Sequence, residues 1–178
     1  MVEAWTWSAV VGVVLGVAVA VVLFVPTLAW ESRRFGRLRW SRTVAAGAAA
    51  VYGVTVLAYT FLPLPGPGWC AAHTSPPRDL RPFHSVEVIA RAAVGLSPRG
   101  LLISPAFLQV AMNVVLFVPW GAFARRLFGL PAWAAVLSGC LCSVVIEATQ
   151  GTAVWGLFAC VFRSADIDDV ITNTTGAA

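Results

Sequence analysis

Long apolar runs constrain this chain more than any other feature of its sequence. The first run carries no charged residue from Ala4 to Trp30. About 20 mostly apolar residues are enough for a helix to cross a bilayer. Hydrophobic residues make up 59% of the 178 residues and charged residues 11%, against about 45–50% and roughly 25% in soluble domains. This balance excludes a soluble globular enzyme, a disordered tail and a disulfide-rich secreted module, and it predicts a polytopic membrane protein.

A cleaved signal peptide is the alternative for the first run, because residues 27–29 loosely resemble a cleavage site. No positively charged segment precedes the run, however, and it is longer than the apolar core of a signal peptide. We therefore expect a first transmembrane helix here. Three further spans are expected at residues 43–62, from residue 105 to just before Arg125, and at residues 131–150.

The arginines indicate how these spans are oriented. All twelve basic residues are Arg, and the net charge is +4. Five of the arginines lie within residues 31–42, and basic loops of this kind stay on the cytoplasmic side. Arg125 and Arg126 end the third span where the same orientation requires a cytoplasmic end. The sequence therefore predicts a multi-pass plasma membrane protein with an extracytoplasmic N-terminus, and membrane topology explains its basic character better than nucleic-acid binding does.

The remaining segments are too short or too polar to cross the membrane. Residues 85–96 have helical apolar spacing, which favours an amphipathic helix lying on the outer membrane surface. Residues 151–162 are apolar but short, so we expect an interfacial or re-entrant piece. Only 13 residues remain from Asp166 onward. The expected fold is an all-α polytopic integral membrane helical bundle, with four complete spans and a fifth truncated at the C-terminus. Residues 1–75 would form two N-terminal helices and residues 76–178 a second domain.

Polar residues inside or beside the expected spans are the candidates for function. Glu147 and Gln150 share one face of the fourth span at i and i+3, and Asp166, Asp169 and Asn173 share one face of the last segment. The topology brings these faces to the outer membrane surface. There we predict one polar binding cluster, made of Asn113, Glu147, Gln150, Arg163, Asp166, Asp168, Asp169 and Asn173.

The charges of this cluster permit several interpretations. A buried carboxylate without a partner is costly, and Arg163 is the cation that could bridge Glu147 and an Asp. A bound cation, protonated carboxyls or exposure at the interface would balance the other acids. Asn113 suits an interhelical hydrogen bond, and acids at a helix start suit capping. Acidic oxygen clusters also suit Mg²⁺ or Ca²⁺, but their spacing here is weak evidence, so we assign no metal and no cofactor.

The cysteines and histidines add little to this prediction. Cys70 and Cys160 both fall on the outer side, but nothing in the sequence fixes their distance, so a disulfide between them is not favoured. Cys140 and Cys142 lie inside an apolar helix and are expected to be packing residues. The two histidines lack the spacing of metal ligands.

Three motifs in order resemble the VanZ-like family. They read Asn113-x-x-x-Phe117-x-Pro119-x-Gly121, Ile146-Glu147-x-x-Gln150 and Arg163-x-x-Asp166-Ile167-Asp168-Asp169-x-Ile171-x-Asn173-Thr174-x-Gly176. Residues 80–83 also resemble a Pro-Phe element of that family, so the likeness covers about residues 80–178. The chain departs from the family pattern at Asp79 and Arg81, in the unusually apolar residues 151–162, and in lacking the usual closing helix after Gly176.

The resemblance implies a small integral membrane protein of the cell envelope, of a kind found mostly in Gram-positive bacteria. The founding member is linked to low-level resistance to teicoplanin, a lipid-tailed glycopeptide, so the resemblance supplies a phenotype and no reaction. We expect binding of an amphiphile, either a lipid-tailed glycopeptide, a lipid or a cell-wall precursor headgroup, and a contribution to antibiotic resistance. No nucleic-acid partner is expected.

Three alternatives to amphiphile binding stay open. The chain could be a membrane-embedded, metal-assisted enzyme that acts on a lipid-linked substrate, with Glu147 as its base. It could be a structural or partner protein, or a transporter. The sequence contains no recognised nucleophile or metal motif, which favours a binding protein over an enzyme.

Overall fold

The structure is a computed structural model that describes residues 2–36 and 40–178. It divides into two compact units, residues 1–64 and 65–178, which we describe separately. Helices are the regular elements of the described residues, and four of them are long and apolar enough to cross a membrane. The expected all-α bundle with four spans is therefore confirmed. The division into residues 1–75 and 76–178 stays a prediction, and residues 37–39 of the basic loop lie outside the described residues.

The first unit is a pair of helices, α1 (Val2–Phe35) and α2 (Trp40–Phe61). Gly12 and Gly16 of α1 lie directly against the backbone of α2. A Cβ atom at Gly12 would stand 2.7 Å from the Cα atom of Thr55, and one at Gly16 would stand 2.7 Å from the Cα atom of Val51. Small residues four apart let two membrane helices approach closely. The pair is therefore held by backbone-to-backbone packing.

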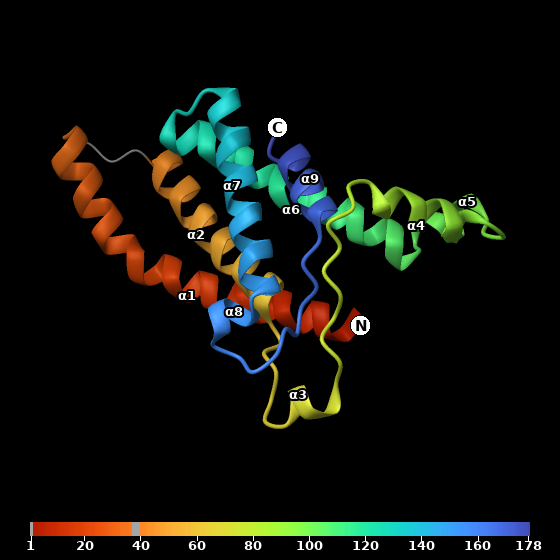
Figure 1. Ribbon diagram of the computed structural model, residues 1–178. Coiled ribbons are helices and arrows are strands. Elements are labelled where there is room, and N and C mark those ends of the chain that lie inside the picture. The colour runs from red at the N-terminus through yellow and green to blue at the C-terminus, as the bar shows by residue number, and fades with distance from the viewer. Residues whose placement is uncertain (1, 37–39) are drawn as a thin grey trace. The chain divides into compact units, whose positions relative to one another are not determined.

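The second unit is built on two long helices and a shorter third one (Figure 1). These are α6 (Pro105–Phe128), α7 (Ala132–Gly151) and α9 (Ile167–Gly176). The shorter elements are α3 (Trp69–Ala72), α4 (His84–Ala93), α5 (Pro98–Leu102) and α8 (Ala153–Gly156). Helix α4 corresponds to the amphipathic helix expected at residues 85–96. Helix α9 has ten residues, which is about 15 Å of helix and half the hydrocarbon core.

The ends of α6 follow from local sequence. The Ser104 side chain accepts a hydrogen bond from the amide of Phe107, and Pro105 occupies the first turn, where its missing N–H is not needed. Gly129 ends the helix in the left-handed conformation, with φ 68°. The chain then turns into α7, whose N-cap is Pro131. The connection between the third and fourth spans is therefore short.

Helix α9 packs between α6 and α7 at glycine contacts. A Cβ atom at Gly121 or at Gly139 would overlap Ala177, which follows α9, and one at Gly176 would overlap the backbone of Val114. Phe117, on the same side of α6, is completely buried. This close approach brings the polar residues of α9 next to both long helices.

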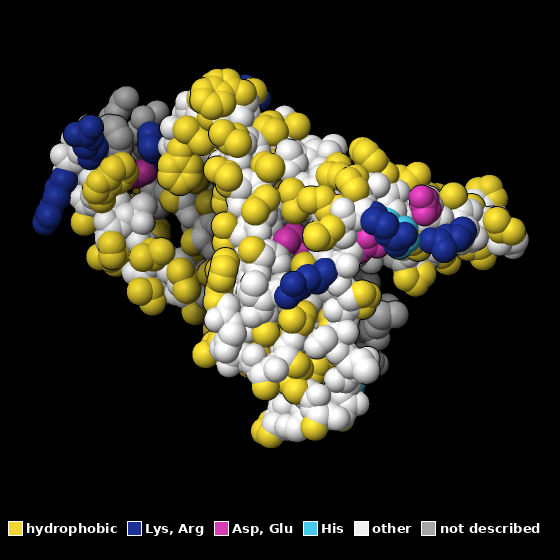
Figure 2. All heavy atoms as spheres, in the orientation of Figure 1, with side chains coloured by type: hydrophobic (Ala, Val, Ile, Leu, Met, Phe, Trp, Pro, Cys, Tyr) yellow, Lys and Arg dark blue, Asp and Glu magenta, His cyan; other side chains and the backbone are white. Residues whose placement is uncertain are grey.

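The surfaces of the long helices are apolar where they do not pack on one another. Figure 2 shows hydrophobic side chains spread over the visible face, with charged side chains gathered in a few places. On α7, Leu137, Leu141 and Val145 are all exposed. Exposed apolar side chains along a helix of this length are typical of a lipid-facing surface. The chain is therefore a membrane-embedded protein.

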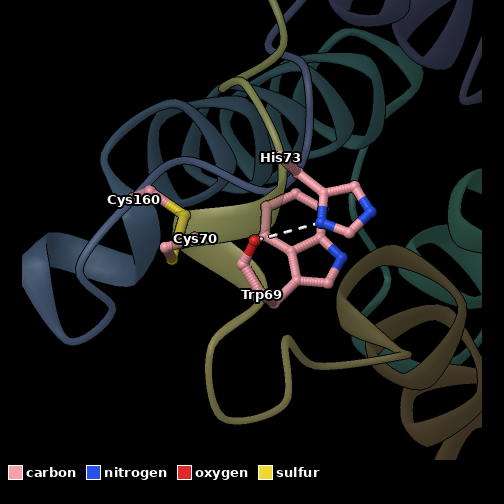
Figure 3. Close-up of a disulfide and its surroundings, with 4 residues drawn as sticks. All are labelled: Trp69, Cys70, His73 and Cys160. Carbon is pink, nitrogen blue, oxygen red and sulfur yellow. Dashed lines mark hydrogen bonds between the residues drawn. A yellow bond between two sulfur atoms is a disulfide. The ribbon is translucent and has the colours of Figure 1, made fainter.

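A disulfide joins Cys70 to Cys160, with an S–S distance of 2.10 Å and a Cα–Cα distance of 5.7 Å (Figure 3). The sequence analysis did not favour this bond, because it gave no distance between two cysteines separated by 90 residues. Beside it the Trp69 and His73 rings stack, with their centroids 4.4 Å apart. The bond fastens the α3 segment to the chain that leads from α7 to α9.

That connecting chain begins with an unusual turn. Ala153, Val154 and Trp155 have φ values of 54°, 55° and 58°. The left-handed conformation is rare for any residue other than glycine, and is most strained for a β-branched one such as Val154. The turn reverses the chain after α7, so that residues 151–162 do not form a further span. Their expected position at the membrane interface stays a prediction.

Candidate functional site

Helices α7 and α9 are joined by a buried polar contact. The Asn173 side-chain amide donates a hydrogen bond of 2.9 Å to the Ser143 hydroxyl. Both side chains are buried, and the amide oxygen of Asn173 has no hydrogen-bond partner among the described residues. Leaving a buried acceptor unpaired is unfavourable. Asn173 is thus buried between α7 and α9.

A second polar contact joins α9 to α6. It lies one helical turn before Asn173, nearer the start of α9. The Asn113 amide donates a hydrogen bond of 2.5 Å to Asp169, and the Gln109 side chain also hydrogen-bonds to that carboxylate. The interhelical hydrogen bond expected for Asn113 is therefore present. Gln109 was missed by the sequence analysis, although it lies one helical turn before Asn113.

Glu147 connects α7 to the start of α9. Its carboxylate accepts a hydrogen bond of 2.8 Å from the amide of Asp166, and its side chain is buried. The Asp166 side chain in turn accepts from the amide of Asp168 at 2.8 Å and caps α9. Burial raises the pKa of Asp166 above its usual range. The capping role expected for the acidic group therefore belongs to Asp166.

Asp168 has a different role from the other acids. Its carboxylate accepts hydrogen bonds from the amides of Phe83, at 2.5 Å, and Ser85, at 2.6 Å. These two amides lie at the start of α4, where backbone N–H groups lack helical partners. Asp168 is only 4% exposed. The structure thus uses Asp168 to fasten α4 to α9, a contact that the sequence analysis did not foresee.

Residues 78–84 form a second strip of polar contacts beside α9. The backbone of Asp79 pairs with Ala165 and Ile167 through hydrogen bonds of 2.9 and 3.0 Å. The Asp79 carboxylate accepts from the Arg81 guanidinium and contacts His84. Hydrogen bonds from Arg81 lower the pKa of Asp79 to about 2. The sequence analysis noted Asp79 and Arg81 only as departures from the family pattern.

Gln150 and Arg163 complete the predicted cluster. Gln150 lies at the end of α7, and Arg163 lies in the chain that leads to α9, each half-buried. The predicted pairing of Arg163 with Glu147 stays a prediction. Of the eight predicted residues, the contacts above link Asn113 with Asp169, Glu147 with Asp166 and Asp166 with Asp168.

An open groove lies on this unit, beside Glu147. Its volume is about 310 Å³. The apolar lining includes Leu80, Val144, Ala148, Ile167 and Val170, and the polar lining includes Arg78, Glu147, Thr152 and Asp166. The Arg78 guanidinium donates a hydrogen bond of 2.5 Å to the carbonyl of Gly151, the last residue of α7. A cation at a helix C-terminus is favoured by the helix dipole.

The surface of the groove is mostly apolar, and its few polar side chains, Arg78, Glu147, Thr152 and Asp166, lie around the C-terminal end of α7 and the start of α9. Val144 precedes Gly151 by seven residues, which is about 10 Å of helix. An elongated molecule could therefore place an apolar portion at Val144 and a polar portion at Arg78. Among the described residues, no three His, Cys, Asp or Glu side chains are arranged to hold a metal ion.

Comparison with protein families agrees with this arrangement. The sequence profile of the VanZ/LLP1 family matches residues 49–178. The chain belongs to the VanZ/LLP1 family. No curated protein and no solved structure gives a significant match. The VanZ/LLP1 match extends further toward the N-terminus than the motifs at residues 80–178, and it includes most of α2.

The three sequence motifs of this VanZ/LLP1 protein meet in one region of the structure. The first is on α6 and supplies Asn113, the second is on α7 and supplies Glu147, and the third begins just before α9 and supplies Asp166 and Asp169. Gly121 and Gly176, at the ends of the first and third motifs, are the positions where α9 packs most closely. The three motifs thus contain residues through which α9 and the chain just before it contact α6 and α7.

Proposed function

We propose that this VanZ/LLP1 protein binds an amphiphile at the outer leaflet of the plasma membrane and thereby contributes to resistance against teicoplanin-type glycopeptides. The observation that carries the proposal is the groove, whose mostly apolar wall on α7 and α9 includes a few polar side chains. A lipid tail would lie against Val144, Ala148 and Val170, and a polar headgroup would lie near Arg78 and Glu147. Pockets with mostly apolar walls and a few polar groups are typical ligand sites.

Two observations support an outer-leaflet location. Disulfides persist in oxidising compartments, and Cys160 follows the end of α7 that carries the polar part of the groove. Arg125 and Arg126 lie in the last turn of α6, one span away along the chain, as the positive-inside rule requires of a cytoplasmic end. Since the spans alternate, we propose an extracytoplasmic N-terminus.

Susceptibility to teicoplanin tests the biological part of the proposal. A sensitive Gram-positive host would express the protein, Glu147→Gln or Asp169→Asn, with membrane abundance matched by blot. Both variants keep a hydrogen-bond acceptor for the groups that now donate to them, so the bundle should be retained. We expect the parent to protect and both variants to lose protection. Equal protection by all three would show that these carboxylates are scaffolding.

Ligand-dependent stabilisation of the purified protein tests binding itself, because a ligand that binds only the folded state raises its stability. Teicoplanin should raise the melting temperature, and a glycopeptide without a lipid tail should not. Ala148→Phe places a large side chain in the groove and should abolish the shift. Leu141→Phe, on the exposed surface of the same helix outside the groove, is the matched control. If teicoplanin still raised the melting temperature of Ala148→Phe, the groove would not be the binding site.

A further inference from the structure

The segment that precedes α6 carries a set of exposed apolar side chains. We call residues 80–103 the arm; it contains α4 and α5 and projects from the start of α6 (Figure 1). Val86 is 61% exposed, Val94 84% and Ile103 66%. Leu80, Phe83, Leu96 and Leu102 are exposed too. Exposed apolar side chains concentrated in one short segment mark a surface that contacts protein or membrane.

Helix α4 has two faces, and only one of them packs within the unit. Val88, on the half-buried face, lines a pocket of about 270 Å³ together with Ala106 and Gln109 of α6. Val86, Ala90 and Val94 are exposed and recur at i, i+4 and i+8, so they form a second stripe on the other face. Nothing in the described part of the unit covers this stripe.

Basic side chains flank the apolar ones. Arg81, Arg91 and Arg99 are all exposed, whereas Glu87 is the only acidic residue between positions 80 and 103. Figure 2 shows hydrophobic, basic and acidic side chains next to one another over this part of the molecule. Guanidinium groups bind phosphate oxygens in bidentate fashion. The charge of the arm therefore complements an anionic phosphate surface.

Chain continuity places the arm at the edge of the bilayer. Helix α5 ends at Leu102, and the membrane-spanning α6 begins at Pro105. Two intervening residues span at most about 10 Å between the helices, so the α5 end of the arm lies close to the end of α6 that enters the bilayer. An amphipathic helix with Arg beside an apolar stripe binds there, with its apolar face toward the acyl chains.

We propose that the arm is an interfacial anchor that selects anionic phospholipids, with its Val86–Ala90–Val94 stripe in the bilayer and Arg91 and Arg99 on lipid phosphates. This inference goes beyond the groove and does not depend on what the groove binds. The sequence alone predicted an amphipathic helix on the membrane surface. The present proposal adds α5, the role of the arginines and the class of lipid that they bind.

Spin-label accessibility in nanodiscs tests the position of the arm. The full chain with Cys140→Ala and Cys142→Ala would carry one label, at Val94→Cys or, as a control in the segment between α3 and α4, at Thr74→Cys. We expect the label at position 94 to collide severalfold more with oxygen than with a water-soluble nickel complex, and the label at 74 to show the opposite. Equal nickel accessibility at both positions would overturn the proposal, because the stripe would then face water.

Lipid composition tests the selectivity. The label at position 94 would be compared in discs of phosphatidylcholine and in discs containing roughly a quarter phosphatidylglycerol. We expect phosphatidylglycerol to lower the nickel accessibility, and Arg91→Gln with Arg99→Gln to remove that effect. Arg125→Gln with Arg126→Gln, an equal loss of charge at the other end of α6, should retain it. Protection that is the same in both lipids, or that is lost equally in both double variants, would overturn the anionic selectivity.

Discussion

Asn113 on α6 and Asp169 on α9 share a hydrogen bond of 2.5 Å, although 56 residues separate them in the chain. The contact matters because Asp169 is a charged residue in a largely apolar bundle, where polar side chains are stabilised chiefly by partners on neighbouring helices. It joins the first and third motifs of the family directly.

Removing this partner should destabilise the bundle. Asn113→Leu removes one of the two α6 amides that hydrogen-bond to the Asp169 carboxylate and should lower the stability by about 0.5–2 kcal/mol. Asp169→Asn, which keeps an acceptor for Asn113, should cost less. Thermal unfolding in detergent, followed by intrinsic fluorescence, would compare the two variants. An unchanged melting temperature for Asn113→Leu would show that Gln109 alone satisfies Asp169.

The glycines around α9 give a prediction of packing. Gly176→Ala should destabilise the protein by more than about 1 kcal/mol, because its methyl group would overlap the backbone of α6. Gly53→Ala is the matched control on α2, where nothing lies within 4 Å of an added Cβ atom. That change should be neutral or stabilising, since alanine favours a helix by about 1 kcal/mol over glycine. The melting temperatures of the two variants would test this prediction. An unchanged melting temperature for Gly176→Ala would contradict the close packing of α9 on α6.

The disulfide gives a prediction for reducing conditions. Cys70→Ser should lower the stability of the second unit by about 2–4 kcal/mol, because the open form has more conformational freedom when unfolded. The free cysteines supply the control: Cys140→Ser with Cys142→Ser should leave the effect of a reductant on the melting temperature unchanged. If a reductant does not affect the melting temperature of the parent protein, the bond does not stabilise it.

Asp79 gives a prediction for pH. Its pKa of about 2 is below the ordinary value of 3.8, because Arg81 donates hydrogen bonds to the charged carboxylate. The folded state therefore holds this proton less tightly than the unfolded state, so the contribution to stability is complete above about pH 4 and is lost as the pH falls toward 2. The difference in melting temperature between the parent and Asp79→Asn should shrink over that range. A difference that grows on acidification would contradict the assignment.

Asp168 gives a prediction about local order. Asp168→Ala removes the acceptor for the amides of Phe83 and Ser85, so hydrogen exchange in α4 should become faster. Exchange in α7 provides the internal reference and should change less. If α4 stays as protected as in the parent, the start of this helix is held by the contacts of Asp79 instead.

Much of the fold could be predicted from local sequence. The ends of α6 follow from Ser104, Pro105 and Gly129, whose preferences act within a few residues. The contacts of Asn113 and Glu147 could also be predicted from the sequence, because helical periodicity and alternating spans place both residues near the start of α9. These predictions depended only on the register of apolar helices, which the membrane constrains strongly.

The polar connections could not be predicted in the same way. The direction of the Asp168 carboxylate depends on where α4 begins, and the Arg78–Gly151 contact depends on the path of a loop without periodicity. The Cys70–Cys160 bond likewise required a distance between two such loops. Side chains that join irregular segments are set by the tertiary structure, and spacing along the sequence carries little information about them.

The bond between Cys70 and Cys160 also makes the protein topologically a ring with two tails. The ring contains α4, α5, α6, α7 and the short α8, whereas α9 belongs to the C-terminal tail and packs against α6 and α7 of the ring. A single cut by a protease within the ring would open it without separating the chain into two molecules. A force pulling on the two termini would likewise pass through the disulfide, so the helices within the ring would be shielded from extension until that bond was reduced.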